Sequence, residues 1–547
     1  MAAIPFLIWI QVLGRYGLDF PVADQWDTPF FALAEAFSGQ TDIATWFNQH
    51  NESRKLFPTG LSVLLATSLD TWDTKAELWF GWLLCVALVL SILGVCRTTS
   101  WLSRTEAALI ALLLSLLLWS PITWFLHMWS ITFERLIPET ALVAGVWFYL
   151  RSTGIWKAAG LAFLAFLAQY SYAGGAMIWP LFLLLLLRDL WFDRTKVAPL
   201  GIYLTAFIAS STVYFFTYEP PPHHPSMVAI LEFSPGQITG FFLTIIGRTF
   251  ASHQHQAMAY GLIVVSGFLI AACRTTFARG LDAISSGWVL IGLYGISQAL
   301  LATAGRLPLN PLESLRPDYV TYGIYPLVAT VALVLGTPQD KQSRIIGYLY
   351  PAILLLLSYG GGFDRPSAMD EMRHRYHKVK ASQSCVHLLL SMPGSETCAR
   401  YVYPFTGIVA RIRQAQELGM LTFAPVQEGG AKAGHVDEFT ITSGGALTRG
   451  WANLNGTPAD GIVFSAPQGA GRYIAAVVPT GEFRPDIAES QGGRMAFAGW
   501  SYRIPAEDVR DLMNHAGNNI CLLQAQAFDT TDGILRPLNW HRPGCPN

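Results

Sequence analysis

Apolar runs long enough to cross a lipid bilayer recur along most of this chain and restrict its fold more than any other feature. A transmembrane helix needs about 20 predominantly apolar residues, and such runs follow one another from residue 76 to residue 358. Of the 547 residues, 52% are hydrophobic and only 13% are charged. The sequence therefore predicts a polytopic α-helical membrane protein surrounded by membrane lipids. Its net charge of −1 gives no indication of a nucleic-acid partner.

We expect about eleven membrane spans and two shorter helices that lie in the membrane interface. The interfacial helices are expected at 56–69 and 237–250, which are too short to cross and carry Arg54, Lys55 and Arg248 at their ends. The first span lacks the basic flank of a signal peptide, and a late start site would account for its short length. The expected spans are 4–18, 76–96, 105–120, 138–150, 158–170, 174–187, 197–217, 257–273, 282–302, 320–336 and 345–359.

The distribution of Lys and Arg supports this topology. With a cytoplasmic N-terminus, the short inner loops carry the basic residues, as the positive-inside rule requires. The tail from 360 to 547 then lies outside, and we expect a bacterial inner-membrane protein with an extracytoplasmic C-terminal region. The long outer loops are 19–75, 121–137, 218–256 and 303–319. The basic residues of the inner loops are Arg97, Arg104, Arg151, Lys157, Arg188, Arg194, Lys196, Arg274, Arg279, Lys341 and Arg344.

The cysteines agree with an outer tail in an oxidising compartment. Cys385, Cys398, Cys521 and Cys545 form an even set there, where disulfides are permitted. Of the three possible pairings, we favour Cys385–Cys398 and Cys521–Cys545, because each closes a local loop. The cysteines that we expect to be apolar fillers in or beside spans are Cys85, Cys96 and Cys273.

The outer tail is expected to change from helix to strand. Residues 365–420 have apolar positions at helical spacing, and from about 436 the period becomes two between Gly, Pro, Asn and Asp turns. We therefore expect an extracytoplasmic α+β region that ends in a compact antiparallel β-sandwich of jelly-roll type. The predicted domains are a membrane domain at 1–360, a helical linker region at 361–435 and the β-sandwich at 436–547.

The sandwich carries two candidate sugar-stacking residues. Its stretches GWANL (450–454) and FRPDIAES (483–490) resemble β-sandwich modules attached to bacterial cell-surface glycan enzymes. Trp451 and Trp500 could stack on sugar faces, or they could be core or edge aromatics, which is the commoner use of such residues.

Ionisable and aromatic residues gather between apolar runs near the start of the chain. The segment 21–60 reads PVADQWDTPFFALAEAFSGQTDIATWFNQHNESRKLFPTG. Ionisable groups set against a membrane are costly, so their concentration is a functional-site hypothesis by default. The residues in question are Asp24, Asp27, Glu35, Asp42, His50, Glu52 and Arg54.

The plan of the chain resembles the GT-C superfamily of polyprenyl-phosphate-dependent membrane glycosyltransferases. The resemblance covers residues 1–360 and rests on an Asp just beyond the first span, interfacial helices in the first outer loop, about eleven spans and an outer C-terminal domain. The stretches QHNESRKLFP (49–58), AGRLPL (304–309) and ESLRPDYVTYG (313–323) look like an uncharacterised bacterial branch. The resemblance implies an inverting transfer of a sugar from a polyprenyl-phosphate donor to a cell-envelope glycan or lipid acceptor on the outer face.

Such a transfer needs a carboxylate that accepts the acceptor's hydroxyl proton, and cations that neutralise the departing lipid phosphate. The resemblance places the catalytic acid at Asp24, which we take as the base. Asp27, one helical turn on, could hold a metal, orient the acceptor or cap the helix that opens at Pro29. A clean DxD or ExD pair is absent from the sequence, so no motif requires a divalent cation such as Mg or Mn, and the cofactor is left open.

The substrate-binding candidates lie in three outer loops. On a helix, His50 and Arg54 share a face and could bind donor phosphate or acceptor hydroxyls together with Glu52. The alternative is an interfacial helix end with a structural Glu52–Arg54 contact. Arg306 and Arg316 flank the loop after the ninth span, and arginine suits phosphate because its planar fork donates two bonds.

Three further residues are considered with them. Tyr319 follows Arg316 at the bilayer edge, where ordinary interfacial anchoring is the alternative role. Glu134 and Glu139 of the second outer loop are expected to line the same cavity. His223-His224 and His253-Gln254-His255 lack the further ligands of a defined zinc site and are read as solvated loop histidines.

Two other functions compete with the enzyme. A lipid-linked glycan transporter or flippase would need a polar path through the membrane, yet the polar residues gather at the outer face and no inverted repeat is apparent. A membrane-anchored glycan-binding assembly protein would need only one span. The sequence has no P-loop, Rossmann fingerprint or Gly-x-Ser-x-Gly elbow, so nucleotide-sugar and serine chemistry are not indicated.

Overall fold

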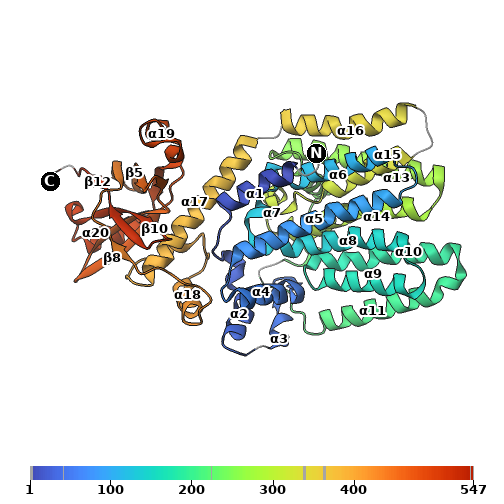
Figure 1. Ribbon diagram of the computed structural model, residues 1–547, viewed down its shortest axis with the longest axis horizontal. Helices are drawn as coiled ribbons and strands as arrows, with labels where there is room; N and C mark the ends of the chain where they lie inside the picture. The colour runs from blue at the N-terminus through green and yellow to red at the C-terminus, as the bar shows by residue number, and fades with distance from the viewer. Residues whose placement is uncertain are drawn as a thin grey trace. The chain divides into compact units, whose positions relative to one another are not determined.

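The chain folds into two compact units, each built from several stretches of sequence. The computed structural model describes residues 4–40, 42–222, 225–336, 341–360, 365–542 and 544–545 (Figure 1). The first, which we call the helical unit, comprises Met1–Gly17, Ile43–Leu61 and Lys75–Met369. The second, the mixed unit, comprises Leu18–Asp42, Ser62–Thr74 and Asp370–Asn547. The domain boundaries predicted at residues 360 and 435 stay a prediction.

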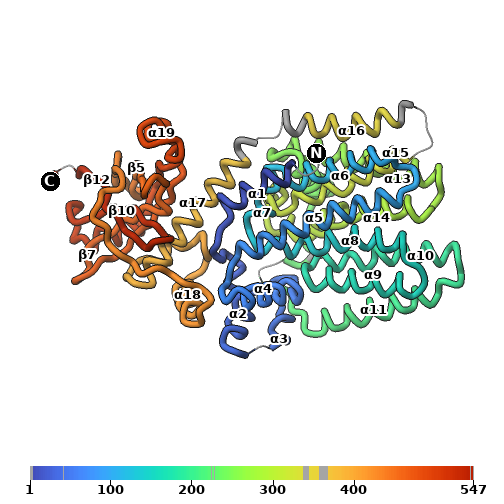
Figure 2. Tube along the Cα trace, viewed as in Figure 1, coloured from blue at the N-terminus to red at the C-terminus, as the bar shows by residue number. Residues whose placement is uncertain are grey.

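The helical unit holds most of the helices, although α4 continues into the mixed unit after Leu61. Figure 2 shows α8, α9, α10 and α11 side by side. Its elements are α1 (Ile4–Tyr16), α3 (Ile43–Trp46), β1 (Gln49–His50), β2 (Ser53–Arg54), α4 (Leu56–Leu69), α5 (Thr74–Thr98), α6 (Arg104–Leu118), α7 (Trp124–Met128), α8 (Phe133–Arg151), α9 (Gly154–Gln169), α10 (Ile178–Phe192), α11 (Val197–Phe215), α12 (Pro235–Gly247), α13 (Gln254–Arg279), α14 (Ala283–Arg306), α15 (Ile324–Gly336) and α16 (Lys341–Gly360).

Within the described residues, six helical segments are long and apolar enough to cross a membrane, and a seventh is counted if the bent pair Arg104–Leu118 and Pro121–Met128 is one span. This supports a multi-pass membrane protein, but it does not confirm eleven spans. α1, α9 and the apolar part of α16 are shorter than the roughly 20 residues that a crossing needs. The six segments are Thr74–Thr98, Ala173–Phe192, Arg194–Phe215, Gln254–Arg279, Ala283–Arg306 and Pro317–Gly336.

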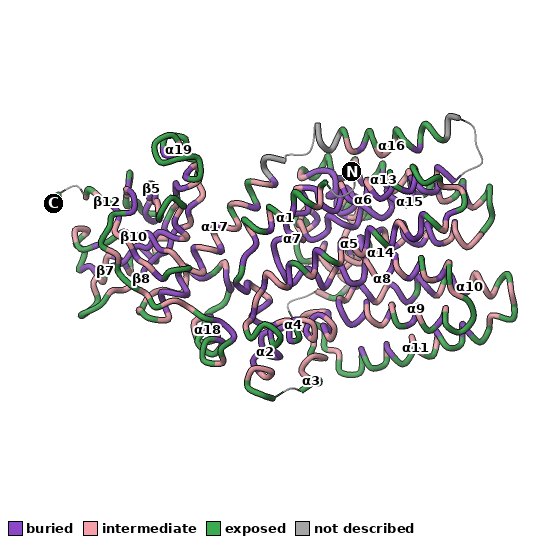
Figure 3. Tube along the Cα trace, viewed as in Figure 1, coloured by how far each residue is buried: buried purple, intermediate pink, exposed green. Residues whose placement is uncertain are grey.

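Helix packing in this unit relies on small residues and on caps that the sequence supplies. Gly261 of α13 lies so close to α12 that an added Cβ would come within 1.9 Å of the Leu243 carbonyl oxygen, the close approach that small residues permit between membrane helices. Ser103 caps α6, and Glu106 completes its capping box. α15 is the most enclosed helix, because every residue but Val334 is buried (Figure 3).

The mixed unit contains two five-stranded sheets around one core. Their orders are β3-β11-β10-β7-β8 and β12-β4-β5-β6, with β9 also paired to β5. Both sheets and α20 contribute to the same buried cluster, through residues such as Phe464, Trp500 and Leu512. The strands are β3 (Gln427–Glu428), β4 (Gly434–Thr442), β5 (Gly445–Leu454), β6 (Thr457–Pro458), β7 (Gly461–Gln468), β8 (Gly471–Val478), β9 (Gly499–Ile504), β10 (Gln524–Asp529), β11 (Ile534–Pro537) and β12 (Asn539–Trp540).

The predicted sandwich is confirmed in its coarse form, as a C-terminal β-sheet region. The purely antiparallel arrangement is wrong at two edges, since β11 pairs with β3 and β12 with β4 in parallel. Helices also interrupt the strands, and the stretch FRPDIAES forms one of them. The remaining helices of the unit are α2 (Phe30–Phe37), α17 (Arg365–Leu389), α18 (Ile408–Glu417), α19 (Pro485–Gln491) and α20 (Ala506–His515).

The two tryptophans proposed for sugar stacking are both packed against the mixed unit's hydrophobic clusters, Trp500 within a core and Trp451 at the margin of one. Trp500 is 2% exposed, and its indole N–H donates to the Thr448 hydroxyl at 3.2 Å. Trp451 is half-buried against Met495 and its neighbours. The core interpretation therefore holds for Trp500, whose ring faces offer no surface to a sugar.

Both predicted disulfides are present, at Cys385–Cys398 and Cys521–Cys545. Cys385 lies on α17, so the first bridge ties that helix to the short 3₁₀ helix η9 (Glu396–Ala399). The helices expected between 365 and 420 are α17 and α18, and Gly419 follows α18 in the left-handed region with φ +76°.

Early residues of the chain complete the mixed unit. Trp26 and Phe30 are fully buried, and their rings lie 5.5 and 6.3 Å from that of Trp72. The Trp72 backbone N–H donates to the Met420 carbonyl oxygen at 2.9 Å. The unit thus joins segments that are some 350 residues apart in sequence.

Candidate functional site

A cavity of about 790 Å³ opens in the helical unit. Its walls come from the end of α11, the proline-rich connection after it, the 3₁₀ helix η4 (Ala173–Met177) and the C-terminal part of α14. Most of the wall is apolar or aromatic, and the charged side chains on it are Glu52 and Arg306. The aromatic side chains of the lining are Tyr172, Tyr214, Phe215, Tyr218, Tyr319 and Tyr322.

Arg306 and Glu52 form an ion pair on this wall. Arg306 is the last residue of α14, and its Nη2 lies 2.7 Å from Oε1 of Glu52. The two side chains are 23% and 34% exposed, so solvent and ligands can reach the pair. The Tyr214 hydroxyl donates to the Glu52 carbonyl oxygen at 2.9 Å and holds the Glu52 backbone at the cavity.

Glu52 reaches the cavity because residues 49–54 form a β-hairpin, where a helix was expected. β1 and β2 pair with Gln49 opposite Arg54 and His50 opposite Ser53. Asn51, at the turn, has φ +51°, a conformation that asparagine tolerates better than most residues. His50 and Arg54 therefore lie on opposite faces of the hairpin, and the shared face predicted for them is wrong.

Arg54 holds the surrounding backbone together. Its guanidinium donates to the carbonyl oxygens of Tyr214 and Phe47 at 2.7 and 2.8 Å, and to the Thr217 hydroxyl at 2.8 Å. The structural Glu52–Arg54 contact is thus replaced by the Glu52–Arg306 pair. The hairpin, the end of α11 and one wall of the cavity are joined through this arginine.

Buried charges lie next to the cavity. Asp318 accepts from Arg135 at 3.2 Å and from Arg316 at 2.7 Å. The Arg135 guanidinium lies over the ring of Tyr172, 5.1 Å from its centroid, and Tyr172 belongs to the cavity wall. Burial disfavours the charged form of Arg316, but Asp318, Tyr319 and Glu313 together outweigh this effect and raise the pKa of Arg316 above its usual value. Arg316 thus supports the wall, to which buried Tyr319 contributes directly.

Glu134 and Glu139 do not belong to the cavity lining. Glu134 forms an ion pair with Lys55 at 2.9 Å, in which the side chains are 7% and 6% exposed. Glu139 accepts from the hydroxyls of Thr321 and Tyr325 at 2.6 and 2.7 Å. Both glutamates therefore tie helix ends together within the helical unit.

Asp24 and Asp27 belong to the mixed unit, on and directly after the 3₁₀ helix η1 (Ala23–Trp26). Asp27 pairs with Arg411 at 2.7 Å and accepts from the Tyr403 hydroxyl at 3.1 Å. The half-buried Asp24 carboxylate makes no hydrogen bond or ion pair with the described part of the chain.

Asp27 does not cap the following helix. α2 begins at Phe30, and its N-cap residue is Pro29, which has no side-chain bond to the helix. Burial, followed by the charge of Asp27, raises the pKa of the Tyr403 hydroxyl. The two aspartates thus differ, because Asp27 is held by a cation and a phenol while Asp24 has no such partner among the described residues.

Metal ligands do not cluster in the described residues, where no group of three or more His, Cys, Asp or Glu side chains is placed to hold an ion. A divalent cation therefore stays an open prediction. His223-His224 lies outside the described residues.

The sequence did not identify several members of the site. Tyr172, Tyr214 and Tyr218 are separate in sequence and follow no motif, although each lies at the end of an apolar run, where ligand-facing aromatics are common. Asp318 lies in the stretch ESLRPDYVTYG, between Arg316 and Tyr319, which the sequence predicts as binding residues, and this position was the available signal.

Comparisons with known proteins add a likeness among solved structures. No protein-family model and no curated protein matches the sequence. Among solved structures, the chain is similar to the archaeal oligosaccharyltransferase AglB from Archaeoglobus fulgidus, in complex with an inhibitory peptide and a dolichol-phosphate, with 11% identity and a TM-score of 0.41. The match covers 76% of this chain and 59% of that chain, so this chain spans less than two thirds of that protein. Membership of the GT-C superfamily stays a prediction.

Proposed function

We propose that this protein is a membrane glycosyltransferase that moves a sugar from a polyprenyl-phosphate donor to a glycan or lipid acceptor of the cell envelope, with inversion at the sugar carbon. The observation that carries the proposal is the cavity of about 790 Å³, whose walls are largely apolar and aromatic and which holds Arg306. A lipid-linked sugar phosphate combines an apolar chain, a sugar that stacks on aromatic rings and an anion that suits arginine.

In this proposal Arg306 binds the donor phosphate. Glu52 occupies the guanidinium in the free protein, and the phosphate replaces it on binding. Tyr172, Tyr319 and their neighbours form the wall against the sugar and the first part of the lipid. As the bond from the sugar carbon to the phosphate oxygen breaks, Arg306 stabilises the charge that develops on the departing polyprenyl phosphate.

Asp24 serves as the base. We propose this role because such a transfer needs a carboxylate that accepts the proton of the acceptor hydroxyl, and the sequence resemblance places the catalytic acid at Asp24. Its lack of a partner among the described residues supports this role, whereas Asp27 is already engaged by Arg411. Asp27 then orients the loop that carries the base. Arg54 and Arg316 act on the substrate through the walls that they support, and we keep His50 and Glu134 as proposed binding residues and a divalent cation as an open prediction.

The test is transfer by the purified protein in lipid nanodiscs. A panel of radiolabelled polyprenyl-phosphate sugars is offered with isolated envelope glycans and lipids as acceptors, and we expect one donor to be consumed with release of polyprenyl phosphate. Arg104→Ala, an exposed change in the same unit, is the matched control. Failure of every donor to react, with donor crossing the bilayer of sealed vesicles, would favour the transporter.

We further propose that the protein lies in a bacterial inner membrane with residues 360–547 outside. Ser443 is exposed in the turn between β4 and β5, so an engineered cysteine there is open to reagents. A thiol reagent that cannot cross membranes should label it in intact spheroplasts. Labelling only after lysis would contradict this orientation.

A further inference from the structure

A small pocket in the mixed unit brings together two cations, two phenols and a buried acid. It lies where α17, η9, β8 and the start of α20 meet, and its volume is about 20 Å³. The space accepts one edge of a ligand, such as a carboxylate or a sugar hydroxyl, while the rest of the ligand stays in solvent. The polar lining residues are Lys378, Ser382, Thr397, Arg400, Tyr401, Tyr502 and Asp508.

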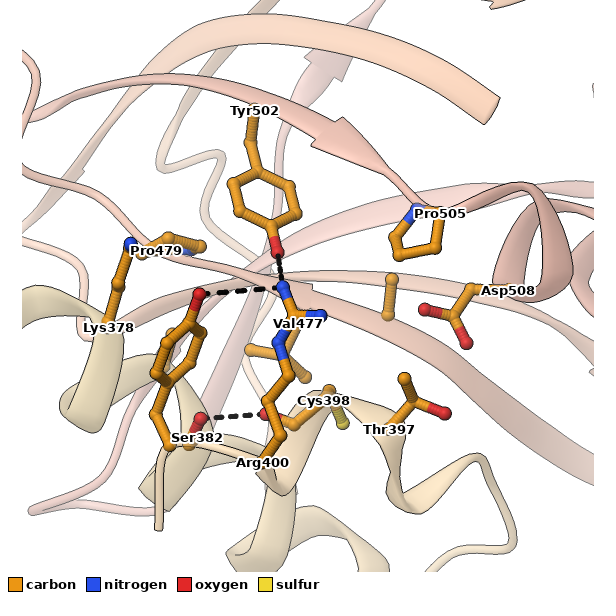
Figure 4. A pocket seen from close by; sticks show the side chains of 13 residues that line it. Lys378, Ser382, Thr397, Cys398, Arg400, Val477, Pro479, Tyr502, Pro505 and Asp508 are labelled. Carbon is orange, nitrogen blue, oxygen red and sulfur yellow. Dashed lines mark hydrogen bonds between the residues drawn. The ribbon is translucent and has the colours of Figure 1, made fainter. Parts of the chain in front are cut away.

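Arg400 stands at the centre of the pocket (Figure 4). Its Nη2 donates to the Tyr502 hydroxyl at 2.9 Å and lies 3.5 Å from the Tyr401 hydroxyl. The guanidinium also lies 5.1 Å from the centroid of the Tyr401 ring, and the Lys378 ammonium lies at the same distance from that ring. Two cations thus share one aromatic side chain.

Neither cation forms an ion pair with any carboxylate of the described residues. Arg400 is exposed, and the hydrogen bonds of its guanidinium reach only the hydroxyl oxygens of Tyr401 and Tyr502. An arginine with spare donors is suited to a planar anion, which it binds through two parallel bonds. The positive charges of Arg400 and Lys378 are therefore not neutralised by an ion pair within the described ranges, and the pocket can bind an anion.

Asp508 adds a carboxyl group, which accepts hydrogen bonds, to a pocket that otherwise carries cations and phenols. Its side chain lies across Arg400 from Lys378 in Figure 4, and the residue is only 3% exposed. One carboxyl oxygen accepts from the Ser395 hydroxyl at 3.3 Å, and the other has no hydrogen-bond partner in the described chain. Burial raises the pKa of Asp508 to about 6. A ligand hydroxyl would satisfy the free oxygen.

The frame of the pocket is covalently held. The Cys385–Cys398 disulfide joins α17 to η9, which carry Lys378 and Thr397 respectively, and the Ser382 hydroxyl donates to the Cys398 carbonyl oxygen at 2.8 Å. Such a frame keeps the polar groups in place before a ligand arrives, which reduces the ordering cost of binding.

We propose that this pocket binds an acidic sugar, a hexuronic acid unit of a glycan. Its carboxylate would pair with Arg400 and Lys378, a hydroxyl would donate to Asp508, and its ring would lie against Tyr401 or Tyr502. An inorganic anion matches the cations but not the acid, and a neutral sugar matches the acid but not the cations. The pocket would serve this purpose whether or not the helical unit transfers a sugar.

The test measures binding of small probes to the full-length protein in nanodiscs by saturation-transfer NMR and calorimetry. The probes are methyl β-D-glucuronide, methyl β-D-glucoside, sodium acetate and sodium sulfate. We expect millimolar binding of the glucuronide and at least tenfold weaker binding of the other three. Equal binding of the glucoside would overturn the proposal, and equal binding of acetate or sulfate would reduce the pocket to a simple anion site and overturn it as well.

Three variants locate the binding. Arg400→Gln and Lys378→Gln should each weaken the glucuronide at least tenfold, and Asp508→Asn should remove the preference for the glucuronide over acetate. Arg494→Gln, an exposed change elsewhere in the mixed unit, is the control and should leave affinity unchanged. Lys378→Gln is a half-exposed change that keeps the fold testable if Arg400→Gln unfolds the unit. Unchanged affinity in both cation variants would overturn the proposal.

Discussion

Replacement of Arg306 separates its role in binding from its role in stability. If Arg306 holds the donor phosphate, Arg306→Ala removes charge-assisted hydrogen bonding, and the loss of one such bond costs about 1.5–3 kcal/mol. The Michaelis constant for the donor should therefore rise about 10- to 150-fold. Arg306→Lys should recover only part of this loss, because lysine cannot make the two parallel bonds.

Stability should change little in the same variant. The pair with Glu52 has side chains that are 23% and 34% exposed, and ion pairs that solvent reaches contribute about 1 kcal/mol or less. Glu52→Gln should act in the opposite direction on binding. It releases Arg306 from its internal partner, so donor affinity should increase by up to about fivefold.

The assay is steady-state transfer in nanodiscs at varied donor concentration, with thermal unfolding followed by tryptophan fluorescence. Arg104→Ala is again the control. The reasoning fails if Arg306→Ala keeps the donor Michaelis constant within twofold of wild type, or if Glu52→Gln weakens donor binding, since the glutamate would then be part of the binding site itself.

Four other changes have defined outcomes. Asp24→Asn should lower transfer about a hundredfold or more without loss of stability. Asp27→Asn should instead lower the unfolding midpoint by the equivalent of about 1 kcal/mol, because it weakens the pair with Arg411. If turnover is lost in Asp27→Asn and kept in Asp24→Asn, the two roles are exchanged. Lys55→Met removes the cation from a buried ion pair and should lower the free energy of unfolding by about 3–5 kcal/mol, measured by thermal unfolding. A small effect would mean that the pair is solvated. The pKa of Asp508, raised to about 6, means that the folded protein holds this proton more tightly than the unfolded chain, so stability falls as pH rises from about 4 to 6 and then levels off. Asp508→Asn should abolish that slope in unfolding midpoints measured between pH 4 and 7, and an unchanged slope would assign it to another group.

Local sequence signals predicted the elements that local chemistry decides. α5, α13 and α14 follow from long apolar runs, and the two disulfides follow from cysteines that are only 13 and 24 residues apart. The strands β7 and β8 follow from β-branched runs between turn residues.

The hairpin at 49–54 was missed because its two strands are too short to show a period. The distribution of charges in the loops also predicted more spans than there are described helices long and apolar enough to cross a membrane. α8 begins with Glu134, Arg135 and Glu139, so it does not qualify as a span by length and composition although a span was expected there.

The candidate site was predicted only in part, because its pairs are long-range. Glu52 and Arg306 were both considered, but they are 254 residues apart and no local pattern relates them. No local pattern relates Asp27 to Arg411 either, because they are 384 residues apart, and the sequence did not point to Arg411. Arg54 was predicted to bind substrate because of its charge, but its guanidinium instead donates hydrogen bonds to backbone carbonyl oxygens of neighbouring segments.

The interleaved construction of the mixed unit has a consequence for how the protein is made. Residues 18–42 emerge from the ribosome first, but their partners on α18 and after it follow nearly four hundred residues later. At about 5–20 residues per second, this interval is roughly 20–80 s. During it, the Trp26 carbonyl oxygen and the Asp27 carboxylate lack Arg411, which bonds to both in the finished protein. The mixed unit can therefore be completed only after synthesis of its C-terminal part, and a truncation before α17 would leave residues 18–42 without these partners.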